Sequence, residues 1–139
     1  MSEPGLLLPA LALVAWTFVM MAWVLASRLP LIRQALAGQV SLGSDPEHPT
    51  WPREVARVSD NYNHLHEQPT LFYAVALVGH ALGVQSPAAV GLAWAYVVLR
   101  VLHSLVQATR NVIPVRFVLF LVSGACLMGL FGIVAAAAL

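Results

Sequence analysis

Four apolar segments constrain the fold of this chain more than any other feature. The first runs from Leu6 to about Ala26 without a charged residue. That length can cross a hydrocarbon core of about 30 Å at about 1.5 Å per residue. The other segments lie within stretches that begin near Arg53, Ala88 and Val115. We therefore predict an all-α integral membrane protein, a bundle of four transmembrane helices at about 6–32, 53–82, 88–110 and 115–138.

The composition agrees with a membrane protein. Hydrophobic residues make up 60% of the chain and charged residues 9%, whereas soluble domains carry about 25% charged residues. A length of 139 residues predicts one membrane domain over 1–139. We expect no cleaved signal peptide, because the N-terminus lacks a positive charge and its apolar run is too long. The net charge of +1, without a lysine-rich run, predicts no nucleic-acid partner.

The connections between the segments differ in length and composition. The longest is a predicted loop over about 33–52, where residues 41–52 include three prolines and two acidic residues. Such a composition excludes a regular element there. The connection at 83–87 is a tight turn. Pro69 lies inside the predicted helix 53–82, where it removes one backbone hydrogen bond and predicts a kink.

All cationic side chains are arginines, and they predict the orientation of the chain. Arginine binds carboxylates and phosphates with two parallel hydrogen bonds and stays charged when half buried. The connections after the first and third helices carry arginines, while both termini and the 83–87 turn carry none. By the positive-inside rule, the arginine-bearing loops are cytoplasmic and both termini face the other side. The seven are Arg28, Arg33, Arg53, Arg57, Arg100, Arg110 and Arg116.

The third predicted helix carries a polar stripe. Arg100 follows twelve apolar or aromatic residues, so we expect it about 10 Å or more below the cytoplasmic surface. An arginine at that depth costs about 2.5–3.5 kcal/mol and should face the bundle interior or a wet cavity. The alternative is a structural arginine neutralised by an acid on the preceding helix. The stripe consists of Tyr96, Arg100, His103, Ser104, Gln107, Arg110 and Asn111, which share a helix face.

The second predicted helix supplies a matching polar face, formed by Arg57, Asn61, His64 and Gln68. Glu67 flanks this face and is the deepest acid in the chain. It would either compensate an arginine charge or bind an ammonium group of a ligand. Several arginines with few acids would suit a ligand with two carboxylates, an amine and an ionisable thiol, which glutathione has.

Two segments of the sequence resemble the MAPEG family, the membrane-associated proteins in eicosanoid and glutathione metabolism. They are Arg57-Val-Ser-Asp-Asn-Tyr-Asn-His-Leu-His-Glu-Gln-Pro-Thr-Leu-Phe-Tyr73 and Leu99-Arg-Val-Leu-His-Ser104, the latter followed by Arg116. The resemblance is closest to a bacterial branch, so it implies a bacterial inner membrane. It also implies a homotrimer that binds glutathione between subunits near the cytoplasmic face, together with membrane lipid and a hydrophobic substrate.

The resemblance further implies roles for individual residues. Arg57 and Arg100 would hold carboxylates, and Asn61 and Glu67 the rest of the peptide. Arg116 would be catalytic, because a nearby guanidinium lowers the pKa of a thiol and the thiolate is the nucleophile. The other residues expected to contact glutathione are His64, His103, Gln107 and Arg110.

Two departures from the family pattern leave two functions open. His64 stands where most members have glutamate, and Gln107 stands where tyrosine is common. The first function is a glutathione-dependent transferase or peroxidase that acts on a hydrophobic electrophile or lipid hydroperoxide. The second is a non-catalytic lipid-binding or scaffold protein, which the family also includes.

Histidine spacing gives a third possibility, which the sequence disfavours. His66 and His80 are 14 residues apart, a spacing that could ligate two stacked haems. Such a site needs partner histidines on another helix, and the third helix offers only His103. No Cys/His cluster has the spacing of a zinc site. We therefore predict no metal and no haem.

Overall fold

The computed structural model describes residues 5–39 and 51–139, and this part of the chain contains helices and no strands. The helices at 6–32, 88–110 and 115–138 are each found within four residues of their predicted bounds. The helix predicted at 53–82 is divided into two. In chain order the elements are α1 (Leu7–Leu36), α2 (Arg53–His64), α3 (Gln68–Ala81), α4 (Pro87–Ala108) and α5 (Ile113–Ala138).

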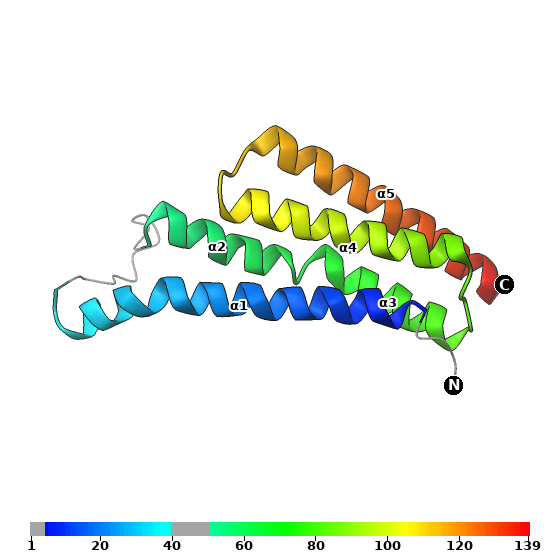
Figure 1. The fold of residues 1–139 in the computed structure, drawn as a ribbon, viewed down its shortest axis with the longest axis horizontal. Coiled ribbons are helices and arrows are strands. Elements are labelled where there is room, and N and C mark those ends of the chain that lie inside the picture. Colours follow the sequence, from blue (N-terminus) through cyan, green and yellow to red (C-terminus); the bar gives the residue numbers. More distant parts are fainter. Residues whose placement is uncertain (1–4, 40–50) are drawn as a thin grey trace.

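The helices lie roughly along one common direction (Figure 1). α2 and α3 follow one another along the length of α1, and α4 lies beside them with α5 packed on it. The start of α1 and the end of α5 lie at one end of the molecule. The opposite end holds the start of α2 and the α4–α5 turn, and we call it the arginine-rich end.

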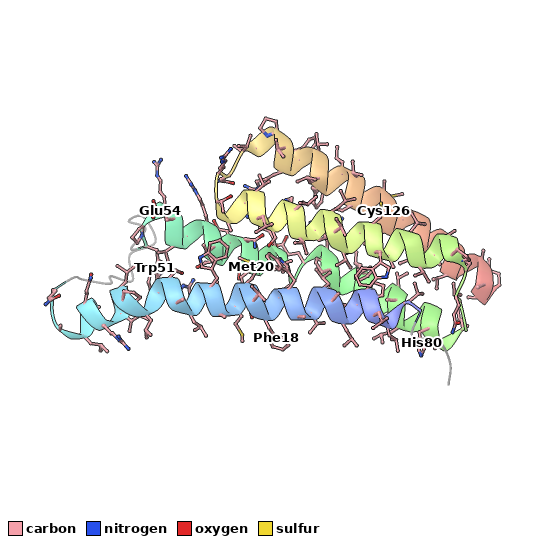
Figure 2. All side chains as sticks on the ribbon, viewed as in Figure 1. Phe18, Met20, Trp51, Glu54, His80 and Cys126 are labelled. Carbon is pink, nitrogen blue, oxygen red and sulfur yellow. The ribbon has the colours of Figure 1, made fainter. Side chains whose placement is uncertain are left out.

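Three helices, α1, α4 and α5, are long and apolar enough to cross a membrane. Their outer surfaces carry large apolar side chains that a soluble protein would bury. Phe18 is 60% exposed and points away from the other helices (Figure 2), and Met128 is 75% exposed. Such a surface fits hydrocarbon rather than water. These observations confirm the prediction that the chain is an integral membrane protein.

The prediction of one kinked helix over 53–82 is wrong, because the helix stops and restarts. Pro69 has no amide hydrogen and its ring disfavours a continuous helix across the preceding turn. The amides of His66 and Glu67 instead bond the carbonyls three residues back, Asn63 at 2.9 Å and His64 at 3.4 Å. α3 then begins with Pro69 in its first turn. With 14 residues, α3 alone is shorter than the about 20 residues that a crossing needs.

Away from the arginine-rich end, α1, α3 and α5 meet at Gly79. A Cβ atom added there would lie 2.6 Å from Leu6 Cδ1 and 2.8 Å from Val134 Cγ2. Leu6 is fully buried and Val134 is 4% exposed. The absence of a side chain at Gly79 therefore sets how closely these three segments pack.

We expect Gly79→Leu to destabilise the protein, because overpacking a close helix contact costs about 1–3 kcal/mol. Gly132→Leu on α5 is the matched control, since a Cβ there meets nothing within 4 Å. Thermal unfolding in detergent should show a melting temperature several degrees lower for Gly79→Leu only. Equal melting of both variants would contradict the packing described at Gly79.

Candidate functional site

A cleft of about 440 Å³ lies between the α2–α3 break, α4 and α5. Its polar lining comes from His64 and Glu67 at the break, His103 on α4 and Arg116 on α5. All four belong to the set of predicted site residues. Ile113, Phe117 and Phe120, all on α5, supply its apolar lining.

His64 and Glu67 lie together at the helix break. Glu67 has φ −92° and ψ −97°, which is not a helical conformation. His64 Nδ1 and Glu67 Oε2 are 3.3 Å apart, and both side chains are partly exposed. An unbroken helix would turn Glu67 well away from the polar face that includes Asn61. The proline that interrupts the helix thus brings the deepest acid to the cleft.

Arg100 lies behind the cleft and is only 2% exposed. Its guanidinium donates to the His64 carbonyl at 3.2 Å and to Gln68 Oε1 at 3.5 Å. Both acceptors border the helix break, so Arg100 ties α4 to it. Glu67 acts on Arg100 electrostatically without an ion-pair contact. The structure therefore does not show the alternative in which an acid paired directly with Arg100 neutralises its charge.

Arg116 is held in place by the turn between α4 and α5. Its guanidinium donates to Asn111 Oδ1 at 2.5 Å. Asn111 has a φ of +52°, a left-handed conformation that asparagine tolerates better than most residues. Helical spacing places Asn111 on the polar face but does not indicate its contact with Arg116. Arg116 Nε is buried and has no hydrogen-bond partner among the described residues, while the partly exposed side chain as a whole lines the cleft.

His103 forms the back of the cleft between the two arginines. It is 4% exposed, and its Nδ1 has no partner within residues 5–39 and 51–139. Arg100, Arg116 and His64 all lie close enough to act on it electrostatically. An imidazole ring here can take part in a hydrogen bond with a bound molecule.

The remaining predicted site residues do not line this cleft. Asn61 is buried and its amide donates to Ser104 Oγ at 2.5 Å, which joins α2 to α4. Gln107 is 3% exposed on α4, and Arg110 is exposed in the turn after α4. Arg57 donates to the Thr109 carbonyl at 3.1 Å and lines a different hollow. Within one protomer, Arg57 therefore lies outside the cleft that Arg116 lines.

The Asn61–Ser104 bond gives a stability prediction. Ser104→Ala would leave a buried amide without its acceptor, at a cost of about 1–3 kcal/mol. Ser123→Ala is the control, because the Ser123 hydroxyl is also buried but donates only to the Phe120 carbonyl of its own helix. Thermal unfolding should show the larger loss for Ser104→Ala. Equal losses would mean that the Asn61 contact adds nothing to the packing of α2 on α4.

An apolar groove of about 640 Å³ continues from the cleft along α3 and α5. Phe120 lines both the cleft and the groove. Gln68, which accepts from Arg100, lies at the junction. The groove is lined by Gln68, Leu71, Ala74, Val75, Phe120, Leu121, Gly124, Ala125, Leu127, Met128 and Phe131. A polar cleft that opens into an apolar groove can hold a polar reactant beside an apolar one.

The described residues contain no group of three or more His, Cys, Asp or Glu side chains that could hold a metal ion. The charged groups at the cleft are the Arg116 guanidinium and the Glu67 carboxylate in its lining, together with the buried Arg100 guanidinium nearby. Such a set can bind a zwitterion with an additional anionic group.

Comparison with known proteins gives one match. The model of the MAPEG family matches residues 6–136 of the chain. No curated protein and no solved structure matches the sequence.

Proposed function

Because the chain belongs to the MAPEG family, we propose that it is a glutathione-dependent membrane transferase or peroxidase. Its second substrate would be a hydrophobic electrophile or a lipid hydroperoxide. The observation that carries this proposal is the cleft in which Arg116, His103, His64 and Glu67 meet beside an apolar groove. Glutathione is the co-substrate, and the proposal includes no metal or haem.

Each polar group of the cleft has a role in this proposal. The Arg116 guanidinium binds the glutathione sulfur and favours its thiolate, which is the attacking nucleophile. Glu67 leaves His64 and binds the ammonium group of the peptide. His103 donates a hydrogen bond to a carboxylate, and the buried charge of Arg100 adds to the positive potential behind it. The thiolate then forms a thioether with an electrophile held in the groove and expels its leaving group. With a hydroperoxide, it attacks the terminal oxygen, which breaks the O–O bond and releases the alkoxide as the alcohol. The resulting sulfenic acid reacts with a second glutathione to give glutathione disulfide and water.

We further propose a homotrimer in which a neighbouring subunit covers the cleft. α2 and α3 together would provide a fourth crossing, because each is too short alone. The arginine-rich end would face the cytoplasm, with both termini on the other side of a bacterial inner membrane. One domain would comprise the whole chain. Family membership and the positions of the arginines support this arrangement.

Turnover by protein reconstituted in lipid tests the proposed function. Calorimetry should show glutathione binding, and conjugation should proceed with at least one hydrophobic electrophile or lipid hydroperoxide. Glu67→Gln should weaken glutathione binding by about tenfold, because a charge-assisted hydrogen bond is replaced by a neutral one. Asp60→Gln on α2 is the control, since Asp60 is exposed and does not line the cleft. Absence of glutathione binding to the wild type would overturn the proposal.

The apolar groove also favours the second candidate, a non-catalytic lipid-binding protein. The groove has a volume of about 640 Å³, and Gln68 is the one polar residue in its lining. Lipid that co-purifies with the protein, together with no turnover on any electrophile or hydroperoxide, would favour this function. Conjugation at a rate that depends on Arg116 would exclude it.

A further inference from the structure

One polar side chain lies in the wall of the apolar groove between α3 and α5. Gln68, at the start of α3, is the one polar residue in the groove lining, and its side chain is partly exposed. A polar group in apolar surroundings is costly unless it finds a hydrogen-bond partner. The contacts of Gln68 therefore indicate what the groove can recognise.

The contact with Arg100 fixes the orientation of the Gln68 amide. The Arg100 guanidinium donates to Gln68 Oε1 at 3.5 Å. A guanidinium has donors and no acceptor, so the atom that faces it is the carbonyl oxygen of the amide. The amide nitrogen lies against α5, because a Cβ atom added at Gly124 would be 3.3 Å from Gln68 Nε2. The two N–H groups are thereby turned toward the α5 wall of the groove.

The amide nitrogen has no acceptor among the residues that the structure describes. The contact with Arg100 is the one hydrogen bond of this side chain within that part of the chain. The other residues of the groove lining are apolar, and the carbonyls inside α5 accept hydrogen bonds within the helix. The charge of Arg100 polarises the amide, which makes its N–H groups stronger donors. The groove therefore offers a free donor to an oxygen atom of its occupant.

Gln68 lies deeper in the groove than the proposed position of the glutathione sulfur. Gly124, which touches the amide, is eight residues beyond Arg116 on α5, about 12 Å along the helix axis. Phe120 lies midway and lines both the cleft and the groove. An electrophile that spans this interval has its attacked atom near the cleft and its acceptor oxygen farther into the groove. The two atoms are then not bonded directly to each other.

This separation distinguishes between classes of hydrophobic electrophile. In an epoxide or a hydroperoxide, the oxygen that gains charge is bonded directly to the attacked atom. A simple alkyl halide has no oxygen to bind. In an α,β-unsaturated ketone, a conjugated carbon chain separates the attacked carbon from the carbonyl oxygen and transfers the charge to that oxygen. A fixed donor at the position of the developing charge stabilises the transition state.

We propose that Gln68 selects α,β-unsaturated ketones of lipid origin as the second substrate, an inference that rests on the proposed function. The thiolate adds to the β-carbon and forms a C–S bond, and the electron pair of the C=C bond moves to the carbonyl oxygen to give an enolate. Gln68 Nε2 donates a hydrogen bond to that oxygen. The enolate then takes a proton from water at the α-carbon, and no group leaves. The alkyl chain on the carbonyl carbon continues along the groove beside Val75 and Phe131.

Conjugation by protein reconstituted in lipid, at saturating glutathione, tests this role of Gln68. The substrates are a long-chain alkyl vinyl ketone and a primary alkyl iodide of the same chain length, and each rate is divided by that of free glutathione. The wild type should accelerate the ketone more than the iodide. Gln68→Glu should lower this ratio by about 10²-fold, because the carboxylate still accepts from Arg100 but has no N–H to donate. Gln34→Glu is the control, since Gln34 is exposed on α1 outside the groove and the cleft, and its ratio should match the wild type.

Gly124→Ala provides a second test that keeps the amide. The added methyl group would lie 3.3 Å from Gln68 Nε2 and displace it by a few tenths of an ångström, so the ratio should fall, but less than in Gln68→Glu. Gly132→Ala is its control, because a Cβ there meets nothing within 4 Å. Equal acceleration of ketone and iodide by the wild type, or a wild-type ratio in Gln68→Glu, would overturn the role of Gln68 and leave the proposed function standing. A wild type that accelerates neither reaction and binds no glutathione would overturn both.

Discussion

Conjugation of glutathione should fall by about 10²-fold in Arg116→Ala, because one preorganised charge that stabilises the thiolate is removed. The ultraviolet absorbance of the bound thiolate should disappear in the same variant. Arg116 is suited to this role because its partly exposed, charged side chain lines the cleft. Both effects should be measured in protein reconstituted with lipid.

Arg53→Ala is the control for this prediction, since it removes an arginine from the same end of the molecule but not from the cleft. Its rate and its thiolate absorbance should match those of the wild type. Arg116→Lys should recover part of the rate, because an ammonium keeps the charge but not the planar guanidinium. If Arg116→Ala kept the full rate, another group would have to stabilise the thiolate.

A second large effect should follow from Arg100→Leu, which acts on the helix break. The variant loses two hydrogen bonds from a buried guanidinium, to His64 and Gln68. Each bond to a charged group is worth about 1.5–3 kcal/mol. We expect a clear fall in melting temperature together with glutathione binding weakened by about tenfold or more, because the break positions His64 and Glu67 in the cleft.

Arg100→Lys separates charge from geometry at this position. The lysine ammonium reaches less far than a guanidinium, and it cannot donate to two acceptors in a fixed plane. Its melting temperature and glutathione affinity should therefore lie between those of Arg100→Leu and the wild type. If Arg100→Leu has the melting temperature and the glutathione affinity of the wild type, Arg100 does not stabilise the helix break.

The membrane class and most helices could be predicted from the sequence because they depend on long apolar runs. A run such as Leu6 to Ala26 leaves few alternatives in a bilayer. The break at residues 65–67 could not be predicted in the same way. Pro69 indicates a local disturbance of the helix. Whether the helix kinks or ends there depends on which carbonyls accept hydrogen bonds from the neighbouring backbone amides.

The site was predicted in part for a similar reason. Helical spacing correctly grouped Arg100 and His103 on one face of α4, and the resemblance added Arg116. Spacing could not show that Asn61 would bond Ser104 or that Arg57 would bond the Thr109 carbonyl. Such pairings depend on the depth and rotation of neighbouring helices, which a single sequence does not define. The break also changed the position of Glu67, which an unbroken helix would have turned away.

The most direct test of the account is an experimental structure of the protein in lipid with glutathione bound. We expect density for the peptide in the cleft, with its sulfur beside the Arg116 guanidinium and its ammonium beside the Glu67 carboxylate. The His64–Glu67 contact would then be replaced by the contact with the ligand. Density for glutathione beside Arg57 instead, or none at saturating glutathione, would contradict the assignment of this cleft as the glutathione site.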